Sequence, residues 1–251
     1  MLTHAGRGNR ARFATTRWSL VLAVADRTGP PDPINEAALA ALCELYWFPI
    51  YAFIRRSGRS ADAAADLTQG FFTAVVEKGY FEQADRDRGR FRSFLLGSVK
   101  HFMATDFHHA TRQKRGGGQA GRALEFGDGE QRYSNEPADQ RTPEDAYEAQ
   151  WAAQVFAAAR ARLEDQHAQG WMRASRFFAP LLAQVFDERD ESFAEMAARL
   201  QTTDGSLRVL AYRVRKQFGV CLRDVISDTV DTPGAVDGEL RHLLTVLGRQ
   251  E

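Results

Sequence analysis

The sequence has few of the features that mark secreted, metal-binding or membrane proteins. Its 251 residues include two cysteines, Cys43 and Cys221, which lie far apart and build neither a disulfide framework nor a zinc site. No apolar run approaches the roughly 20 residues of a membrane-spanning helix. The basic N-terminus leads into no signal-peptide core. These absences predict a soluble cytoplasmic protein that needs no metal, no cofactor and no membrane.

Catalytic motifs are missing as well. The glycine-rich stretch 116–121 (GGGQAG) lacks the Lys-Ser/Thr pair of a P-loop. His108 and His109 are adjacent, so on a helix they point about 100° apart and are poorly placed to hold one ion. We therefore do not expect an enzyme.

No run of alternating apolar and polar residues is long enough for a strand, so the predicted fold is all-α. Apolar residues recur instead at helical steps of three and four. The helices predicted in this way cover about 35–53, 62–78, 90–113, 142–163, 171–187, 192–200 and 203–218, with a further short helix at 16–25. Pro49 lies inside the first of them and is expected to kink or split it.

Residues 116–145 interrupt the helical pattern. They are rich in glycine, polar and acidic residues, and over 125–148 eight acids oppose two arginines. Such a segment buries too little apolar surface to offset its ordering entropy. We therefore predict two small helical domains on a flexible tether. The ranges are an N-terminal extension with a short helix (1–34), a helical bundle (35–115), a flexible acidic linker (116–145), a helix-turn-helix domain (146–230) and a C-terminal tail or helix (231–251).

The second predicted domain contains a helix-turn-helix pattern. Ser192 and Glu195 form a capping box at the start of a short one-sided helix. After a three-residue turn, Thr203 is the expected N-cap of a longer helix, which from 205 to 223 carries five cations and no acid. Its apolar face is expected to pack on the short helix, so the cationic face points outward, where DNA could meet it. An ordinary solvated helix face is the alternative.

The cationic helix supplies the first set of candidate site residues. Arg208 and Tyr212, in its first two turns, are expected to reach base edges, whereas Arg213 and its neighbours are expected to hold phosphates. The candidate DNA-binding residues here are Thr203, Ser206, Arg208, Tyr212, Arg213, Arg215 and Lys216. A second cationic segment, 86–115, carries eight Arg and Lys against two Asp. Because the whole chain is neutral, with 33 cations and 33 acids, two such segments favour a polyanionic partner.

The segments DAAADLTQGFF (62–72) and GRFRSFLLGSVKHFMATDF (89–107) resemble region 2 of a sigma-70 family RNA polymerase sigma factor of the extracytoplasmic-function (ECF) class. The segment 192–218 (SFAEMAARLQTTDGSLRVLAYRVRKQF) resembles region 4 of the same family. The order of region 2, linker and region 4 also agrees. The resemblance spans roughly 35–115 and 150–230.

The resemblance implies a transcription initiation subunit that binds core RNA polymerase and recognises the minus-ten and minus-thirty-five elements of promoter DNA. It implies core-polymerase contacts by Asp62, Asp66, Gln69 and Thr73, although Gly70 stands where many members have an acid. It implies a loop at 80–90 that captures a flipped base of the minus-ten element. The residues it assigns to strand capture and melting are Phe81, Arg88, Arg90, Arg92, Ser93, Lys100 and His101.

The sequence leaves three questions open. A stand-alone helix-turn-helix regulator would use 192–218 alone, and a sigma-like decoy would keep the polymerase contacts but not promoter recognition. An anti-sigma factor is a further candidate partner, whose identity the sequence does not give. The C-terminal segment VDGELRHLLTVLG (236–248) is interpreted as a domain cap, with a regulatory helix as the alternative.

Overall fold

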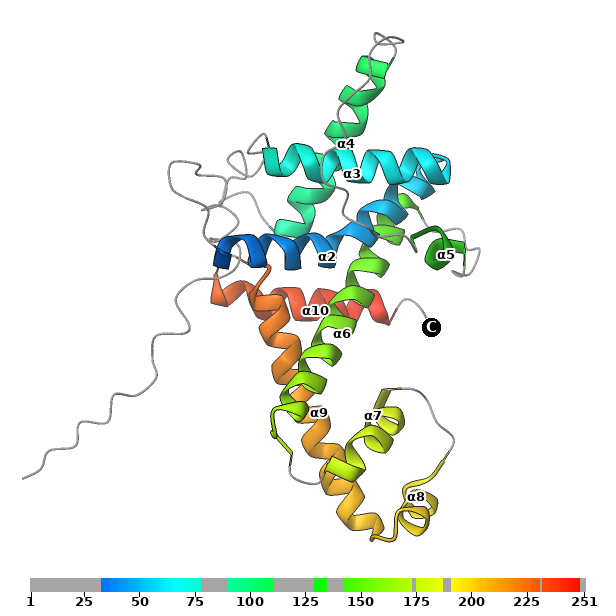
Figure 1. Cartoon of the computed structure of the whole chain (residues 1–251), viewed down its shortest axis with the longest axis vertical. Helices are drawn as coiled ribbons and strands as arrows, with labels where there is room; N and C mark the ends of the chain where they lie inside the picture. Colours follow the sequence, from blue (N-terminus) through cyan, green and yellow to red (C-terminus); the bar gives the residue numbers. More distant parts are fainter. Residues whose placement is uncertain are drawn as a thin grey trace, which may run out of the picture. The chain divides into compact units, whose positions relative to one another are not determined.

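The computed structural model describes residues 33–77, 90–110, 129–134, 142–172, 175–186, 191–230 and 232–248, and these residues form helices and no strand (Figure 1). The all-α prediction is confirmed. The helices are α2 (Pro33–Arg56), α3 (Ala61–Glu77), α4 (Phe91–Ala110), α5 (Gly129–Ser134), α6 (Pro143–Ala168), α7 (Phe178–Phe186), α8 (Phe193–Arg199), α9 (Asp204–Ser227) and α10 (Val236–Leu247), with short 3-10 turns at Ser175–Phe177 and Pro233–Ala235. In this part of the chain, no helix is both apolar and long enough to cross a bilayer.

The chain divides into two compact units. Unit 1 comprises Met1–Ala152 together with Ser227–Glu251, and unit 2 comprises Ala153–Ile226. The boundaries therefore fall inside α6 and at the end of α9, and the C-terminal helix α10 belongs to unit 1. The sequence-based ranges, with a linker at 116–145 and a separate tail after 230, stay a prediction about domains.

Unit 1 is built around α2, whose residues from Leu42 to Ile54 are buried on nearly every side. Such a helix needs partners all round, and α3 and α4 supply two of them. The ring of Phe91 in α4 meets Tyr46 edge-on at 5.2 Å between centroids, and Phe71 of α3 meets Phe102 of α4 at 5.8 Å. Pro49 does not split α2, which is continuous through it; the ribbon bends along its second half (Figure 1).

Helix α5 lies within the segment 116–145 that was predicted to be a flexible linker, so residues 129–134 of that segment are helical in the structure. The tip of α5 packs against the Trp47 ring, and the Glu130 carboxylate accepts hydrogen bonds from Tyr51 (2.6 Å) and Arg55 (2.8 Å from both Nε and Nη2). A polar helix of six residues shows no apolar period. It is held instead by an ion pair to α2, 75 residues away in sequence.

Unit 2 buries a core of aliphatic and aromatic side chains from α6, α7, α8 and α9. Phe156, Phe186 and Phe218 form an aromatic cluster with ring centroids between 4.7 and 5.7 Å apart. The predicted capping box is confirmed: the Glu195 amide donates to the Ser192 hydroxyl at 3.2 Å, and the Ser192 amide donates back to the Glu195 carboxylate at 2.8 Å.

Candidate nucleic-acid interface

The predicted division of α9 into a buried and an outward face is confirmed. Leu207, Ala211, Val214 and Phe218 are buried, at one helical spacing. The candidate DNA contacts Ser206, Arg208, Tyr212, Arg213, Arg215 and Lys216 are all exposed. The apolar face points inward because it fills the unit 2 core, so the cations are left in solvent. The outward face is therefore available to a polyanion.

The beginning of α9 is fixed by local hydrogen bonds. The Thr203 hydroxyl accepts from the Ser206 amide at 3.2 Å and lies 2.8 Å from the Ser206 hydroxyl, so Thr203 is the helix cap that the sequence predicts. Arg208 Nε donates to both Asp204 carboxylate oxygens at 2.9 and 3.0 Å, and the guanidinium lies over the Phe193 ring of α8. A base edge would compete with Asp204 for Arg208.

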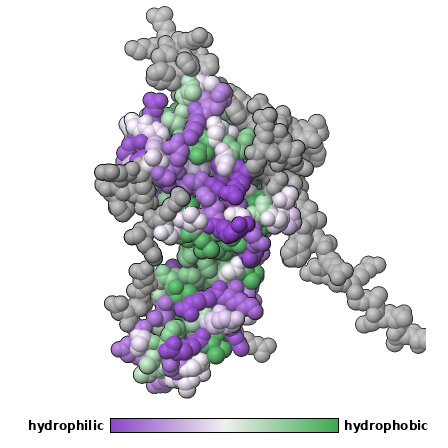
Figure 2. Space-filling view, turned by 180° about the vertical axis from the view of Figure 1, so that it is seen from behind, coloured by the Kyte–Doolittle hydropathy of each residue, from purple (hydrophilic) through white to green (hydrophobic). Residues whose placement is uncertain are grey.

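Beside the outward face, a surface pocket of about 660 Å³ combines cationic and apolar walls. Its lining consists of Trp171, Met172, Leu210, Arg213, Lys216, Gln217 and Val220. Val209 and Val220 of α9 are also exposed, at 53% and 43%. Figure 2 shows hydrophobic and hydrophilic residues interspersed over one face of the described surface. Aliphatic side chains among cations are compatible with contacts to base methyl groups as well as to phosphates.

The predicted core-polymerase residues share one stripe of α3. Asp62 and Asp66 are exposed, and Gln69 and Thr73 are partly exposed, at steps of four, three and four. Gly70 lies off this stripe: a Cβ atom there would sit 3.5 Å from the Phe102 ring of α4. Gly70 therefore faces the neighbouring helix α4.

The residues predicted to capture and melt DNA are placed differently from one another. Phe81 and Arg88 lie outside the described residues. Ser93 and His101 are exposed on α4. Arg90 and Lys100 are half-exposed, at 45% and 46% of the side chain, and each forms an ion pair.

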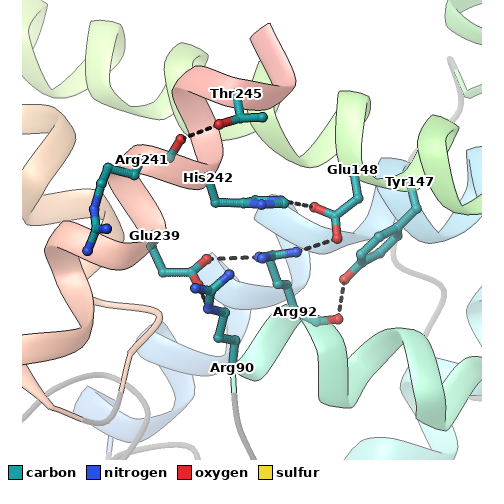
Figure 3. A network of polar contacts seen from close by, with 8 residues as sticks. All are labelled: Arg90, Arg92, Tyr147, Glu148, Glu239, Arg241, His242 and Thr245. Atoms are coloured by element: carbon teal, nitrogen blue, oxygen red, sulfur yellow. Dashed lines mark hydrogen bonds and ion pairs between the residues drawn. The ribbon is translucent and has the colours of Figure 1, made fainter. Parts of the chain in front are cut away.

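Arg92 departs from its expected DNA-facing position, because only 5% of its side chain is exposed. It contacts the Glu148 carboxylate of α6, and its Nε lies 2.8 Å from Glu239 Oε2 of α10 (Figure 3). Its guanidinium also stacks on the Trp151 ring, 5.1 Å from the centroid. Two carboxylates from other helices satisfy this buried cation, so in this structure Arg92 is a core ion-pair residue.

Further contacts extend this network (Figure 3). The Tyr147 hydroxyl donates to the Arg92 carbonyl oxygen at 2.9 Å, and burial raises the pKa of Tyr147 well above its ordinary value, which keeps this donor protonated. His242 Nε2 lies 2.8 Å from Glu148 Oε2, and Arg90 Nε lies 2.6 Å from Glu239 Oε1. The start of α4, the first turns of α6 and helix α10 are therefore joined by charged groups.

A third ion pair lies further along α4, where Lys100 Nζ is 2.7 Å from Glu144 Oε1. Lys100 is the main reason that the pKa of Glu144 is lowered. Glu144, Glu148 and Glu239 are not among the candidate site residues predicted from the sequence. The sequence position of Glu239 does indicate a buried ion pair. It falls on the apolar stripe of Val236, Leu243 and Val246, where a carboxylate needs a buried partner.

Within the described part of the chain, no group of three or more His, Cys, Asp and Glu side chains could hold a metal ion. Comparison of the sequence with protein-family models, and of the chain with curated proteins and with solved structures, gave no match.

Proposed function

We propose that this chain is a sigma-70 family sigma factor of the ECF class, which binds core RNA polymerase and directs it to promoters. The observation that carries the proposal is the outward face of α9, where five exposed cations and an exposed tyrosine follow a capped helix and a short turn. A helix presented in this way fits the major groove of a minus-thirty-five element. The factor would act on chromosomal DNA in the cytoplasm, and an anti-sigma factor would be a further candidate partner.

The acidic stripe of α3 supports the polymerase-binding half of the proposal. Asp62, Asp66 and Gln69 lie on one side of α3 while Phe71 and Val75 fill the core. Exposed carboxylates in register on a rigid helix can pair with a cationic surface of the polymerase. The stripe on α3 lies in the segment that resembles region 2, and α9 lies in the segment that resembles region 4. The resemblance therefore assigns both surfaces to one protein function.

A stand-alone helix-turn-helix regulator is the second candidate, and one observation favours it. Arg213, Arg215 and Lys216 of α9 are exposed to solvent. Arg90, Arg92 and Lys100 of the region 2-like segment are instead each paired with a carboxylate. A regulator of that kind would bind duplex DNA through unit 2 and would gain nothing from polymerase.

Variants of α9 and α3 separate these candidates. In polymerase reconstituted with the chain, Arg213→Gln with Lys216→Gln should abolish promoter-specific RNA synthesis. In DNA-binding assays, the slope of log affinity against log salt concentration should become shallower by about one for each phosphate contact that is lost. Asp66→Lys should abolish polymerase capture but leave duplex DNA binding unchanged. Arg241→Gln, which removes one exposed cation of α10, is the control for loss of a positive charge elsewhere on the surface. If the wild-type chain binds duplex DNA but is not captured by polymerase, the regulator replaces the sigma factor as the better account.

A further inference from the structure

The cations that the proposed function assigns to strand binding on and beside α4 are already occupied by carboxylates of the same chain. Arg90 and Arg92 contact Glu239, Arg92 also contacts Glu148, and Lys100 contacts Glu144. The three acids come from two other helices, α6 and α10. Glu144 and Glu148 are four residues apart, so they lie on one side of α6 and follow α4 along its length.

These carboxylates take the same donors that a phosphate would need. A guanidinium binds a carboxylate or a phosphate through the same planar set of N–H groups, and an ammonium binds either as a point charge. A donor engaged with Glu239 cannot bind a phosphate in the same geometry. Three carboxylates against three cations leave this part of unit 1 without the local positive charge that strand binding requires.

We propose that Glu144, Glu148 and Glu239 form an autoinhibitory contact, in which they compete with the phosphates of single-stranded DNA for Arg90, Arg92 and Lys100. The proposal rests on the proposed function, because it takes α4 to be the strand-binding helix. It assigns a regulatory role to α10, the segment that supplies Glu239. Binding of the melted strand then requires the ion pairs to open.

The burial of each pair sets the order of opening. The Lys100–Glu144 pair is about half exposed on both sides (46% and 47%), so a phosphate can reach Lys100 without movement of a helix. The Arg92–Glu239 pair is closed (5% and 2% exposed), so a phosphate reaches Arg92 only when α10 moves away from α4. Lys100 is therefore the first contact of the strand, and α10 opens last.

The test uses the full chain and a short fluorescein-labelled oligothymidylate, whose binding is followed by fluorescence anisotropy over a series of salt concentrations. Glu144→Gln should free Lys100, tighten binding by roughly threefold and steepen the salt slope by about 0.7, the value for one added phosphate contact on a single strand. Glu164→Gln is the matched control, because Glu164 is on the same helix, is equally exposed at 47% and pairs with Arg160 rather than with α4. Equal effects of the two variants would overturn the proposal.

Two further measurements separate this proposal from the proposed function. Lys100→Gln added to Glu144→Gln should cancel the gain in affinity. If Lys100→Gln weakens binding in the wild-type background while Glu144→Gln does not strengthen it, α4 binds the strand but the autoinhibitory contact is refuted. If Lys100→Gln has no effect in either background, α4 does not bind the strand, and both the contact and the region 2 part of the proposed function fail.

The role of α10 is tested without a variant that risks unfolding. Amide hydrogen exchange in Val236–Leu247 should become faster when the oligothymidylate saturates the protein, because Glu239 then leaves Arg90 and Arg92. Unchanged exchange at saturation would show that α10 stays docked, and would refute the part of the proposal that concerns Glu239.

Discussion

Glu130 provides a sharp test of whether α5 is docked on α2 by electrostatic contacts. Its carboxylate accepts two guanidinium hydrogen bonds from Arg55 and one from the Tyr51 hydroxyl, and the Arg55 bonds are the main reason that its pKa falls from the ordinary 4.5 to about 2. That difference corresponds to roughly 3 kcal/mol of stability at neutral pH. Because 42% of the Glu130 side chain is exposed, solvent screening reduces the expected contribution to about 1–2 kcal/mol.

The perturbation is Glu130→Gln, which removes the charge and keeps the shape. We expect urea unfolding at pH 7 to show a loss of about 1–2 kcal/mol, whereas Glu164→Gln, which breaks an exposed pair within α6, should cost at most about 0.5 kcal/mol. A carboxylate with a lowered pKa stabilises the fold above about pH 4.5, and this stabilisation is lost as the pH falls toward 2. The difference between wild type and Glu130→Gln should therefore shrink over that range.

Two results would refute this reasoning. If Glu130→Gln costs no more than Glu164→Gln at pH 7, the Arg55 contact does not hold α5. If the difference between wild type and variant persists unchanged at pH 2.5, within the titration range given by the lowered pKa, the stabilisation is not due to the ionised carboxylate.

The remaining predictions concern backbone and burial. Gly129→Ala should destabilise unit 1 by about 1–3 kcal/mol, because its Cβ would lie 2.7 Å from the Trp47 ring. Gly97→Ala should stabilise α4 by about 0.5–1 kcal/mol, because there is open space around this position. Urea unfolding measures both effects. Ser192→Ala removes half of the capping box and should cost about 1 kcal/mol, seen as faster hydrogen exchange in α8. Burial raises the pKa of Cys43 to about 12, so a thiol reagent at pH 8 should modify it only after unfolding, and rapid labelling of the folded chain would contradict its burial.

Local signals account for the features that the sequence predicted well. The capping box at Ser192, the Thr203 cap and the stripe from Leu207 to Phe218 all lie within a few residues of the helices they define. Helical period and cap geometry are short-range properties, so they can be read without knowing the rest of the fold. This is why both faces of α9 were assigned correctly.

Long-range ion pairs account for the features that the sequence did not show. In the sequence, Arg92 is one of several cations in a basic segment. The carboxylates that pair with it, Glu148 and Glu239, lie 56 and 147 residues further along the chain. The docking of α5 depends in the same way on Arg55, 75 residues before Glu130. A charge pattern along the chain gives the number of cations, but only the packing of distant helices decides which of them reach solvent.

The measurement that tests the central claim most directly is reconstitution of the full chain with bacterial core RNA polymerase that lacks its own sigma factor, followed by genome-wide mapping of RNA 5′ ends. The account predicts capture of the chain by the enzyme and synthesis from a limited set of start sites that share two spaced DNA elements. Arg208→Gln with Tyr212→Ala should remove these starts while the chain stays bound to polymerase. Polymerase that neither captures the chain nor initiates RNA with it would contradict the account.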